Sequence, residues 1–128
     1  MTTINFNPDS FGIVFPTILT GPEGTKKIQM LIDTGATLCI IPFDIAIALE
    51  YNPSVSKEYT DITTASGSET MPLIKIEKLS LIGKEVQNVK TLCHDLPTTS
   101  RVDGLLGLSY LKHFKLKIDF KAGILALE

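Results

Sequence analysis

Short runs of apolar and β-branched residues alternate with turn-forming residues along most of this sequence. Residues 11–20 and 28–32 are two such runs, and Gly-Pro-Glu-Gly at 21–24 separates them. Strand-forming runs joined by a turn that contains glycine and proline predict a β-hairpin. The same pattern predicts further strands at residues 38–41, 59–64, 71–76, 79–82, 86–92, 116–120 and 124–127.

Two segments depart from the strand pattern. Residues 43–50 are predicted to form a short helix. Pro42 stands just before them, and proline is favourable in the first turn of a helix because its missing N–H would be unpaired there. Leu108, Leu111 and Phe114 recur at the three-residue spacing of a short helix packed on a core. Many short strands with one or two short helices predict a single domain over residues 1–128 that is all-β, mainly antiparallel, and folded as a barrel or sandwich.

Composition narrows the range of partners. Apolar residues make up 44% of the chain and charged residues 20%, and the formal net charge is −2. No run of like charges is dense enough to attract a phosphate backbone or an anionic membrane, so we expect neither nucleic acid nor a membrane as a partner. The N-terminal residues lack a basic segment followed by an apolar one, and we therefore expect a soluble, cytoplasmic protein.

The cysteines and histidines do not suggest a metal or thiol centre. Cys39 and Cys93 lie in apolar contexts and are too few for a disulfide framework, so we expect both to be buried core residues. His94 follows Cys93 directly, but neighbouring residues of a strand point to opposite faces. His113 is expected at the edge of an amphipathic helix. We expect no metal and no cofactor.

Asp33 is the acidic residue with the most unusual setting. It follows the apolar run 28–32 and precedes Thr34, Gly35 and Ala36. Glycine permits backbone conformations closed to other residues and the close approach of another chain, and the threonine hydroxyl can both donate and accept hydrogen bonds. Taken alone, Asp-Thr-Gly is better explained as an ordinary turn, because all three residues are common in turns.

The order of three elements along the chain favours a functional role for Asp33 over an ordinary turn. Asp-Thr-Gly-Ala at 33–36 is followed by a predicted hairpin with Gly67 near its tip, and then by Gly-Leu-Leu-Gly at 104–107. In these elements the chain resembles the retropepsin-like aspartic peptidases, and the resemblance extends over residues 11–127. The segment 111–120 is similar to the tail of small bacterial members.

The resemblance implies a retropepsin-like acid-protease barrel in which each subunit carries one Asp-Thr-Gly and two subunits pair across a two-fold axis. The sequence has no second Asp-Thr-Gly or Asp-Ser-Gly, so activity would require a homodimer. By the same resemblance, Asp33 is catalytic, Thr34 cross-links the two active-site loops, and Gly35 with Ala36 completes each loop. The implied flap consists of Thr64, Ala65, Ser66, Gly67 and Ser68. Leu105, Leu106 and Gly107 would pack beneath the loop.

The implied activity is hydrolysis of peptide bonds in extended polypeptide segments. Two carboxylates are needed because one must accept a proton from water while the other donates a proton to the scissile carbonyl. Like charges a few ångströms apart do not both ionise easily, so the two carboxyl groups share one proton, as is general for aspartic proteases. The nucleophile is then water, and no covalent acyl-enzyme is expected.

Some residues depart from the retroviral pattern. Retroviral members often carry a further acid just after Asp-Thr-Gly-Ala, where this chain has Thr37 and Leu38, and an arginine where this chain has Leu108. An ion pair that steadies the retroviral dimer would then be missing. The main alternative is a catalytically weak or inactive binding or dimerisation module of the same fold, and a further one is a peptidase domain cut from a longer chain.

The other aspartates have more ordinary explanations. Two roles remain open for Asp103, which are to cap a turn or to interact with a basic group in the dimer. Helix starts, turns or exposed strand faces account for the remaining ones, which are Asp44, Asp61, Asp95 and Asp119.

Overall fold

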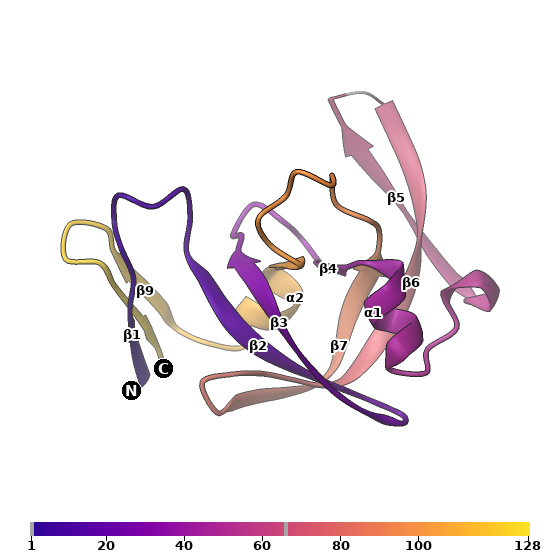
Figure 1. The fold of residues 1–128 in the computed structure, drawn as a ribbon, viewed down its shortest axis with the longest axis horizontal. Helices are drawn as coiled ribbons and strands as arrows, with labels where there is room; N and C mark the ends of the chain where they lie inside the picture. Colours follow the sequence, from indigo (N-terminus) through magenta and orange to yellow (C-terminus); the bar gives the residue numbers. More distant parts are fainter. Residues whose placement is uncertain (1, 66) are drawn as a thin grey trace.

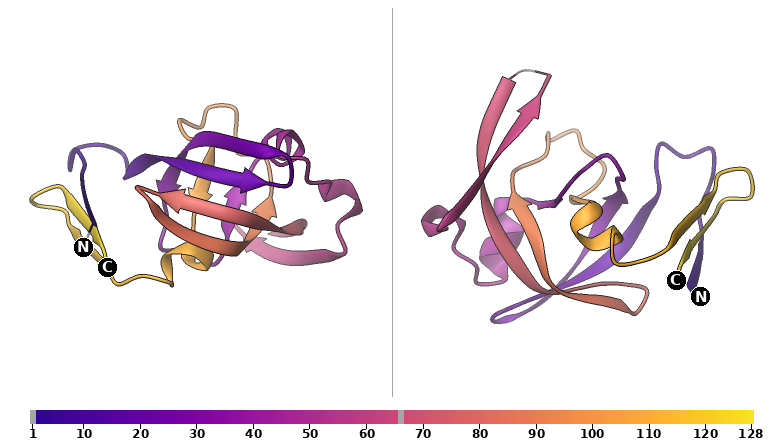
Figure 2. Two further views of the ribbon diagram at one scale, coloured as in Figure 1. Left: turned by 90° about the horizontal axis from the view of Figure 1, so that it is seen from below. Right: turned by 180° about the vertical axis from the view of Figure 1, so that it is seen from behind.

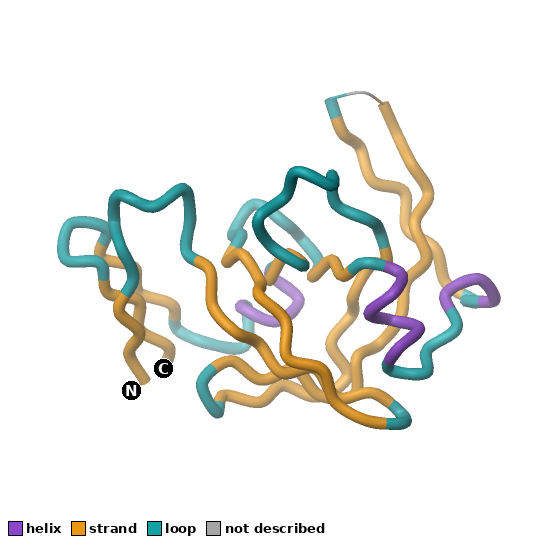
Figure 3. Tube along the Cα trace, in the orientation of Figure 1, coloured by secondary structure: helices purple, strands orange, loops and turns teal. Residues whose placement is uncertain are grey.

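The computed structural model describes residues 2–65 and 67–128 of the chain (Figures 1 and 3). Most of these residues form β-strands, with two short α-helices and a 3-10 turn between them. The strands are β1 (Thr2–Asn5), β2 (Val14–Gly21), β3 (Gly24–Ile32), β4 (Cys39–Ile41), β5 (Glu58–Thr64), β6 (Gly67–Leu81), β7 (Lys84–Cys93), β8 (Gly104–Leu106), β9 (Leu116–Asp119) and β10 (Ile124–Leu127). The helices are α1 (Phe43–Ala48) and α2 (Leu108–Leu111), and the 3-10 turn is η1 (Pro53–Val55).

The larger sheet closes on itself. Its strands follow the order β2-β3-β8-β4-β7-β6-β5, and β2 also pairs with β6. That additional pairing turns the sheet into a barrel and leaves the end of the β5–β6 hairpin projecting from it, as Figures 1 and 2 show. The predicted all-β barrel with short helices is confirmed.

Two pairings inside the barrel are parallel. β3 lies parallel to β8 with Ile32 opposite Leu106, and β4 lies parallel to β7. Parallel neighbours have their carboxyl ends on the same side, so the residues that follow β3 and β8 leave the barrel close together. This places the segment after Ile32 beside the segment after Leu106.

The two ends of the described chain share a smaller sheet. β10 pairs with β1 and with β9, and Thr2 lies opposite Leu127 (Figure 1). This sheet stands to one side of the barrel, and its side chains Ile4, Leu125 and Leu127 are buried in the common hydrophobic core. β1 is not among the strands predicted from the sequence.

The core fills the interior of the barrel with side chains that alternate along the strands. In β3, Ile28 and Met30 are buried while Gln29 between them is exposed, which is the period of two expected of a strand with one face on a core. Cys39 and Cys93 are both buried, as predicted. Other large core side chains are Leu19, Ile41, Leu49, Ile76, Leu79, Leu81, Leu92, Leu106 and Tyr110.

Several predicted boundaries are wrong, and the first predicted strand begins at Val14 and not at residue 11. The strands predicted at 71–76 and 79–82 belong to one strand, β6. The second helix ends at Leu111, so His113 lies in the turn after the helix, where it is exposed. The first helix ends at Ala48, and Glu50 just beyond it has a φ of 68°, outside the helical region. Within residues 2–65 and 67–128, no helix is long and apolar enough to span a membrane.

Candidate active site

Asp33 is held at the end of β3 by backbone hydrogen bonds on both sides. Its N–H donates to the carbonyl of Leu106 at 3.0 Å, and the N–H of the preceding Ile32 donates to the carbonyl of Ile13 at 2.8 Å. Asp33 itself is half-buried. The parallel β3–β8 pairing thus fixes where the acid leaves the sheet.

The residues after Asp33 form a tight loop that turns back on the aspartate. The Gly35 N–H donates to Asp33 Oδ1 at 3.0 Å, and the Ala36 N–H donates to the Asp33 carbonyl at 3.2 Å. Thr34 is exposed, and its hydroxyl has no hydrogen-bond partner in the described part of the chain. The loop therefore orients one carboxylate oxygen and presents Thr34 outward.

The Gly-Leu-Leu-Gly segment lies directly against this loop. The Leu108 N–H donates to the Ala36 carbonyl at 2.8 Å. A Cβ at Gly107 would lie 2.5 Å from the Leu38 carbonyl oxygen and 2.7 Å from that of Ala36, so only glycine fits between them. Residues 104–107 are called the base of the site below.

Side chains of the base and of β4 extend this contact into the core. Leu106 is fully buried, and Leu105 lies opposite Leu31 and Ile40 in the sheet. The Cys39 N–H donates to Ser109 Oγ at 2.9 Å, which connects β4 to α2. The structure therefore brings the segment of Leu105, Leu106 and Gly107 together with the loop of Asp33.

The hairpin of β5 and the first part of β6, residues 58–70, is called the flap hairpin below. Thr64 lies opposite Gly67 in its register, with Ala65 in the turn and Ser68 on the returning strand, while Ser66 lies outside the described residues. Gly67 has a φ of +125°, a conformation that L side chains rarely adopt. The glycine therefore suits the backbone at this end of the hairpin.

A hollow of ≈ 330 Å³ separates the flap hairpin from the loop of Asp33. It is bounded by residues 35–38 on one side and by residues 61–63 of β5 on the other. Ile40, Ile62 and Leu92 add apolar surface. An extended peptide lying between the loop and β5 would place side chains in this hollow.

A second hollow, of ≈ 300 Å³, lies beside the same loop. Asp33 and Thr34 line it together with Phe11 and Gly12, and Phe120 from the turn after β9 contributes its exposed ring. The Asp33 loop therefore borders two hollows, which suits a polypeptide that passes over the carboxylate.

The sequence did not single out the apolar residues that line these hollows. Ile40, Ile62 and Leu92 have the appearance of ordinary strand residues, and Phe11 opens a predicted strand. Each one reaches its hollow only because distant strands pair around it. No local signal in the sequence could have identified them as neighbours of Asp33.

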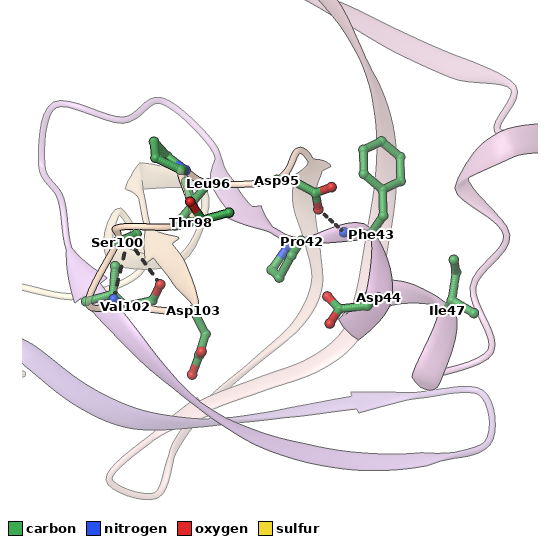
Figure 4. A pocket seen from close by; sticks show the side chains of 11 residues that line it. Pro42, Phe43, Asp44, Ile47, Asp95, Leu96, Thr98, Ser100, Val102 and Asp103 are labelled. Atoms are coloured by element: carbon green, nitrogen blue, oxygen red, sulfur yellow. Dashed lines mark hydrogen bonds between the residues drawn. The ribbon is translucent and has the colours of Figure 1, made fainter.

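A larger hollow lies elsewhere on the surface. It measures ≈ 590 Å³ and lies between α1 and the loop of residues 94–103 (Figure 4). Two of its carboxylates already have structural partners, because Asp95 Oδ1 accepts from the Phe43 N–H at 3.1 Å and Asp103 Oδ2 accepts from the Gln29 N–H at 2.8 Å. Asp33 does not line it, so this hollow is separate from the candidate site.

Asp103 has a structural partner within its own chain. Its backbone N–H also donates to the Gln29 carbonyl at 2.8 Å, so side chain and backbone together clamp the start of β8 to β3. Asp95 caps the first turn of α1, and Asp119 Oδ1 accepts from the Ala122 N–H in the turn before β10. All three carboxylates thus hold backbone in place.

The thiols do not offer a nucleophile. Burial raises the pKa of Cys39, and burial raises the pKa of Cys93 to about 11, so both stay protonated at neutral pH. Among residues 2–65 and 67–128, no group of three His, Cys, Asp or Glu side chains is placed to hold a metal ion. Asp33, on its base and below the flap hairpin, is therefore the strongest candidate for a catalytic group.

A barrel whose single Asp-Thr-Gly lies on a Gly-Leu-Leu-Gly base beside one flap is the architecture of the retropepsin-like aspartic proteases. Residues 23–113 match the family described as gag-polyprotein putative aspartyl protease, and the chain belongs to that family.

Individual relatives are consistent with this assignment. The chain is 27% identical to DNA damage-inducible protein 1 of Neurospora crassa over 128 residues, which is 99% of this chain but only 28% of that protein. The structure resembles a retropepsin-like aspartic protease from Rickettsia conorii with a TM-score of 0.72 at 26% identity, covering 98% of this chain and 88% of that one. The fold is also that of the retroviral protease-like domain of Ddi1 from Leishmania major, with a TM-score of 0.59 at 15% identity over 94% and 90% of the two chains.

Proposed function

We propose that this chain is an aspartic endopeptidase that acts as a homodimer on extended polypeptide segments. The observation that carries the proposal is the half-buried Asp33, which is held on a hydrogen-bonded base and lines one hollow, while the following residues of its loop line a second. One Asp33 supplies one of the two carboxylates that the reaction needs. The second would come from the same residue of a partner subunit.

In the proposed reaction, water lies between the two Asp33 carboxyl groups, which share one proton. The unprotonated carboxylate takes a proton from water as the water oxygen bonds to the scissile carbonyl carbon, and the other carboxyl group gives its proton to the carbonyl oxygen. The carboxyl group that took the proton from water then gives it to the amine nitrogen as the C–N bond of the tetrahedral intermediate breaks. The other carboxylate takes a hydroxyl proton from the intermediate as the product carboxyl group forms, so the two Asp33 groups again share one proton. No covalent enzyme intermediate forms.

The position of the flap hairpin is the reason to expect a substrate in an extended conformation. β5 stands at the end of the strand order, so among the described residues no strand covers its second edge, which could form backbone hydrogen bonds with a peptide strand. The hollow beside it carries Ile40, Ile62 and Leu92, which favour an apolar substrate side chain near the scissile bond. Movement of the hairpin would close the site over the peptide and exclude water.

Surface features near Asp33 support pairing of two copies. Thr34 is exposed beside the carboxylate, and its hydroxyl is available to a partner's loop. Leu108 follows the base and is 39% exposed, although it is apolar. With Thr37 and Leu38 nearby in place of acids, contacts at this position would be uncharged and not ionic, so salt should not weaken them.

The decisive experiment compares the wild type and Asp33→Ala on a degenerate peptide library from acidic to neutral pH, with the oligomeric state recorded at each step. The proposal expects cleavage by the dimeric wild type, strongest in the acidic range, that is lost in a variant that still dimerises. Dilution to the monomer should lower activity per subunit. Equal cleavage by both proteins would overturn the role of Asp33, and absence of cleavage by a folded dimer would favour a binding module.

A further inference from the structure

Arg101 is the one arginine of the sequence, and none of the structural roles described above involves it. Its guanidinium carbon lies 5.2 Å from the centroid of the Phe11 ring, which is a cation–π contact. Both residues are exposed. Within the described residues, no carboxylate lies within ion-pair distance of Arg101. The stack therefore holds a cation in place without neutralising it.

The loop that carries Arg101 is anchored close to it. Asp103, two residues further on, bonds Gln29 through both its carboxylate and its N–H, each at 2.8 Å. Within the loop, the Ser100 hydroxyl donates to the Val102 carbonyl at 3.2 Å. These bonds fix the backbone on either side of Arg101, and they occupy the nearest carboxylate of the loop.

Arg101 lines a hollow that suits an anionic side chain. The hollow measures ≈ 360 Å³, and its other lining residues are apolar or neutral, among them Phe6, Phe15 and the amide residues Asn5 and Gln29. Aspartate and glutamate are absent from its lining. An arginine fork beside amide donors can bind a carboxylate through several hydrogen bonds at once.

This hollow adjoins the hollow of Asp33. Phe11 and Gly12 line both of them. An extended chain that passes along Phe11 and Gly12 would therefore place side chains in both hollows.

We propose that Arg101 is a specificity-determining residue that binds an acidic side chain of the polypeptide substrate, in the hollow next to that of Asp33. The inference rests on the proposed peptidase function for its substrate class. Phe11 is a positioning residue in this scheme, because its ring holds the guanidinium beside the hollow that both residues line. The substrate chemistry is therefore an extended peptide with one carboxylate side chain at a defined distance from the bond that is cut.

The test uses pairs of peptides taken from the preferred library sequence, one with Glu and one with Gln at each position around the scissile bond. Wild type should cleave the Glu peptide about three- to tenfold better at one position, and Arg101→Gln should bring that Glu-to-Gln ratio to about one. Arg101→Glu should reverse the preference and favour Lys. Lys78→Gln is the matched control, because it removes one positive charge from β6 and lines neither hollow.

Peptide binding to Asp33→Asn separates the two proposals, because it requires no turnover. Tighter binding of the Glu peptide, lost when Arg101→Gln is added to Asp33→Asn, would support the inference even if the wild type cleaved nothing. Equal binding and cleavage of the Glu and Gln peptides at every position would overturn it. A weaker dimer in Arg101→Gln with an unchanged Glu-to-Gln ratio would also overturn it, because the arginine would then pair with a carboxylate of the partner subunit.

Discussion

The base and the flap hairpin border the candidate site from two sides, yet they are built in opposite ways. Gly104, Leu106 and Gly107 of the base are buried, and backbone hydrogen bonds connect the Asp33 loop to this segment. The side chains described in the flap hairpin are exposed or half-buried. Dense packing resists displacement, whereas a two-stranded ribbon with few buried contacts opens at low cost in free energy. A peptidase of the kind proposed would thus combine a fixed acid with a movable cover.

The largest expected effect is on the base. Gly107→Ala places a Cβ against the Leu38 and Ala36 carbonyls, so the loop must move and the free energy of unfolding should fall by about 2–3 kcal/mol. Chemical denaturation measures the change, and peptide cleavage should fall with it. Gly83→Ala is the control, because a Cβ there meets nothing within 4 Å although its φ of +75° adds local strain. Equal losses in both variants would show that close packing at Gly107 is unimportant.

Alkaline pH should weaken the core next to the base, where β7 and α2 pack, and leave the flap hairpin unaffected. Burial raises the pKa of Cys93 to about 11 and that of Tyr110 to about 12, from ordinary values of 9.0 and 10.0. The folded state holds these protons more tightly, so this stability is complete below pH 9 and is lost as pH rises toward 12. Unfolding measured at pH 8 and pH 11 tests this, and Cys93→Ala with Tyr110→Phe should flatten the profile. A wild type equally stable at both pH values contradicts it.

In the flap hairpin, Gly67→Ala should change substrate binding more than stability. The φ of +125° at Gly67 strains any side chain, but the strain can be relieved by local distortion of an exposed hairpin. We expect KM for a cleaved peptide to rise about three- to tenfold, with the free energy of unfolding within about 0.5 kcal/mol of the wild type. A loss of stability as large as that of Gly107→Ala would mean that the flap hairpin is as tightly coupled to the core as the base is.

The smallest effect is expected at Thr70. Its hydroxyl donates to Asp61 Oδ1 at 2.6 Å, but both residues are exposed and water can replace the bond. Thr70→Val should cost about 0.5 kcal/mol or less and leave KM within about twofold. Thermal unfolding and steady-state kinetics on the same peptide measure both. A large rise in KM would show that this cross-strand bond shapes the closed flap.

The features of the structure that could be predicted from the sequence are those that depend on local residue patterns. Runs of strand-forming residues identify β2, β3 and β7, and Asp33 follows a strand because apolar residues 28–32 precede it. The same patterns divide β6 in two because Glu77 and Lys78 interrupt its apolar positions, although both are exposed residues of one continuous strand. Propensity within a few residues cannot distinguish such an interruption from a turn.

Pairings between distant segments are beyond the reach of local patterns. β1 is four residues long and is fixed by β10, more than a hundred residues later, so its own sequence carries little signal. The stack of Arg101 on Phe11 and the clamp of Asp103 on Gln29 also join residues far apart in sequence. Side-chain chemistry makes these residues capable of such contacts, but only the folded backbone determines which partner each one meets.

The pairing of Thr2 with Leu127 has a consequence for the order of folding. The β6–β7 hairpin closes a short turn at Gly83, whereas the β1–β10 pair must bring together the most distant described segments of the chain. Loop-closure entropy makes non-local pairing slower than hairpin formation. The small terminal sheet should therefore assemble in a late kinetic phase, after the local hairpins of the barrel have formed.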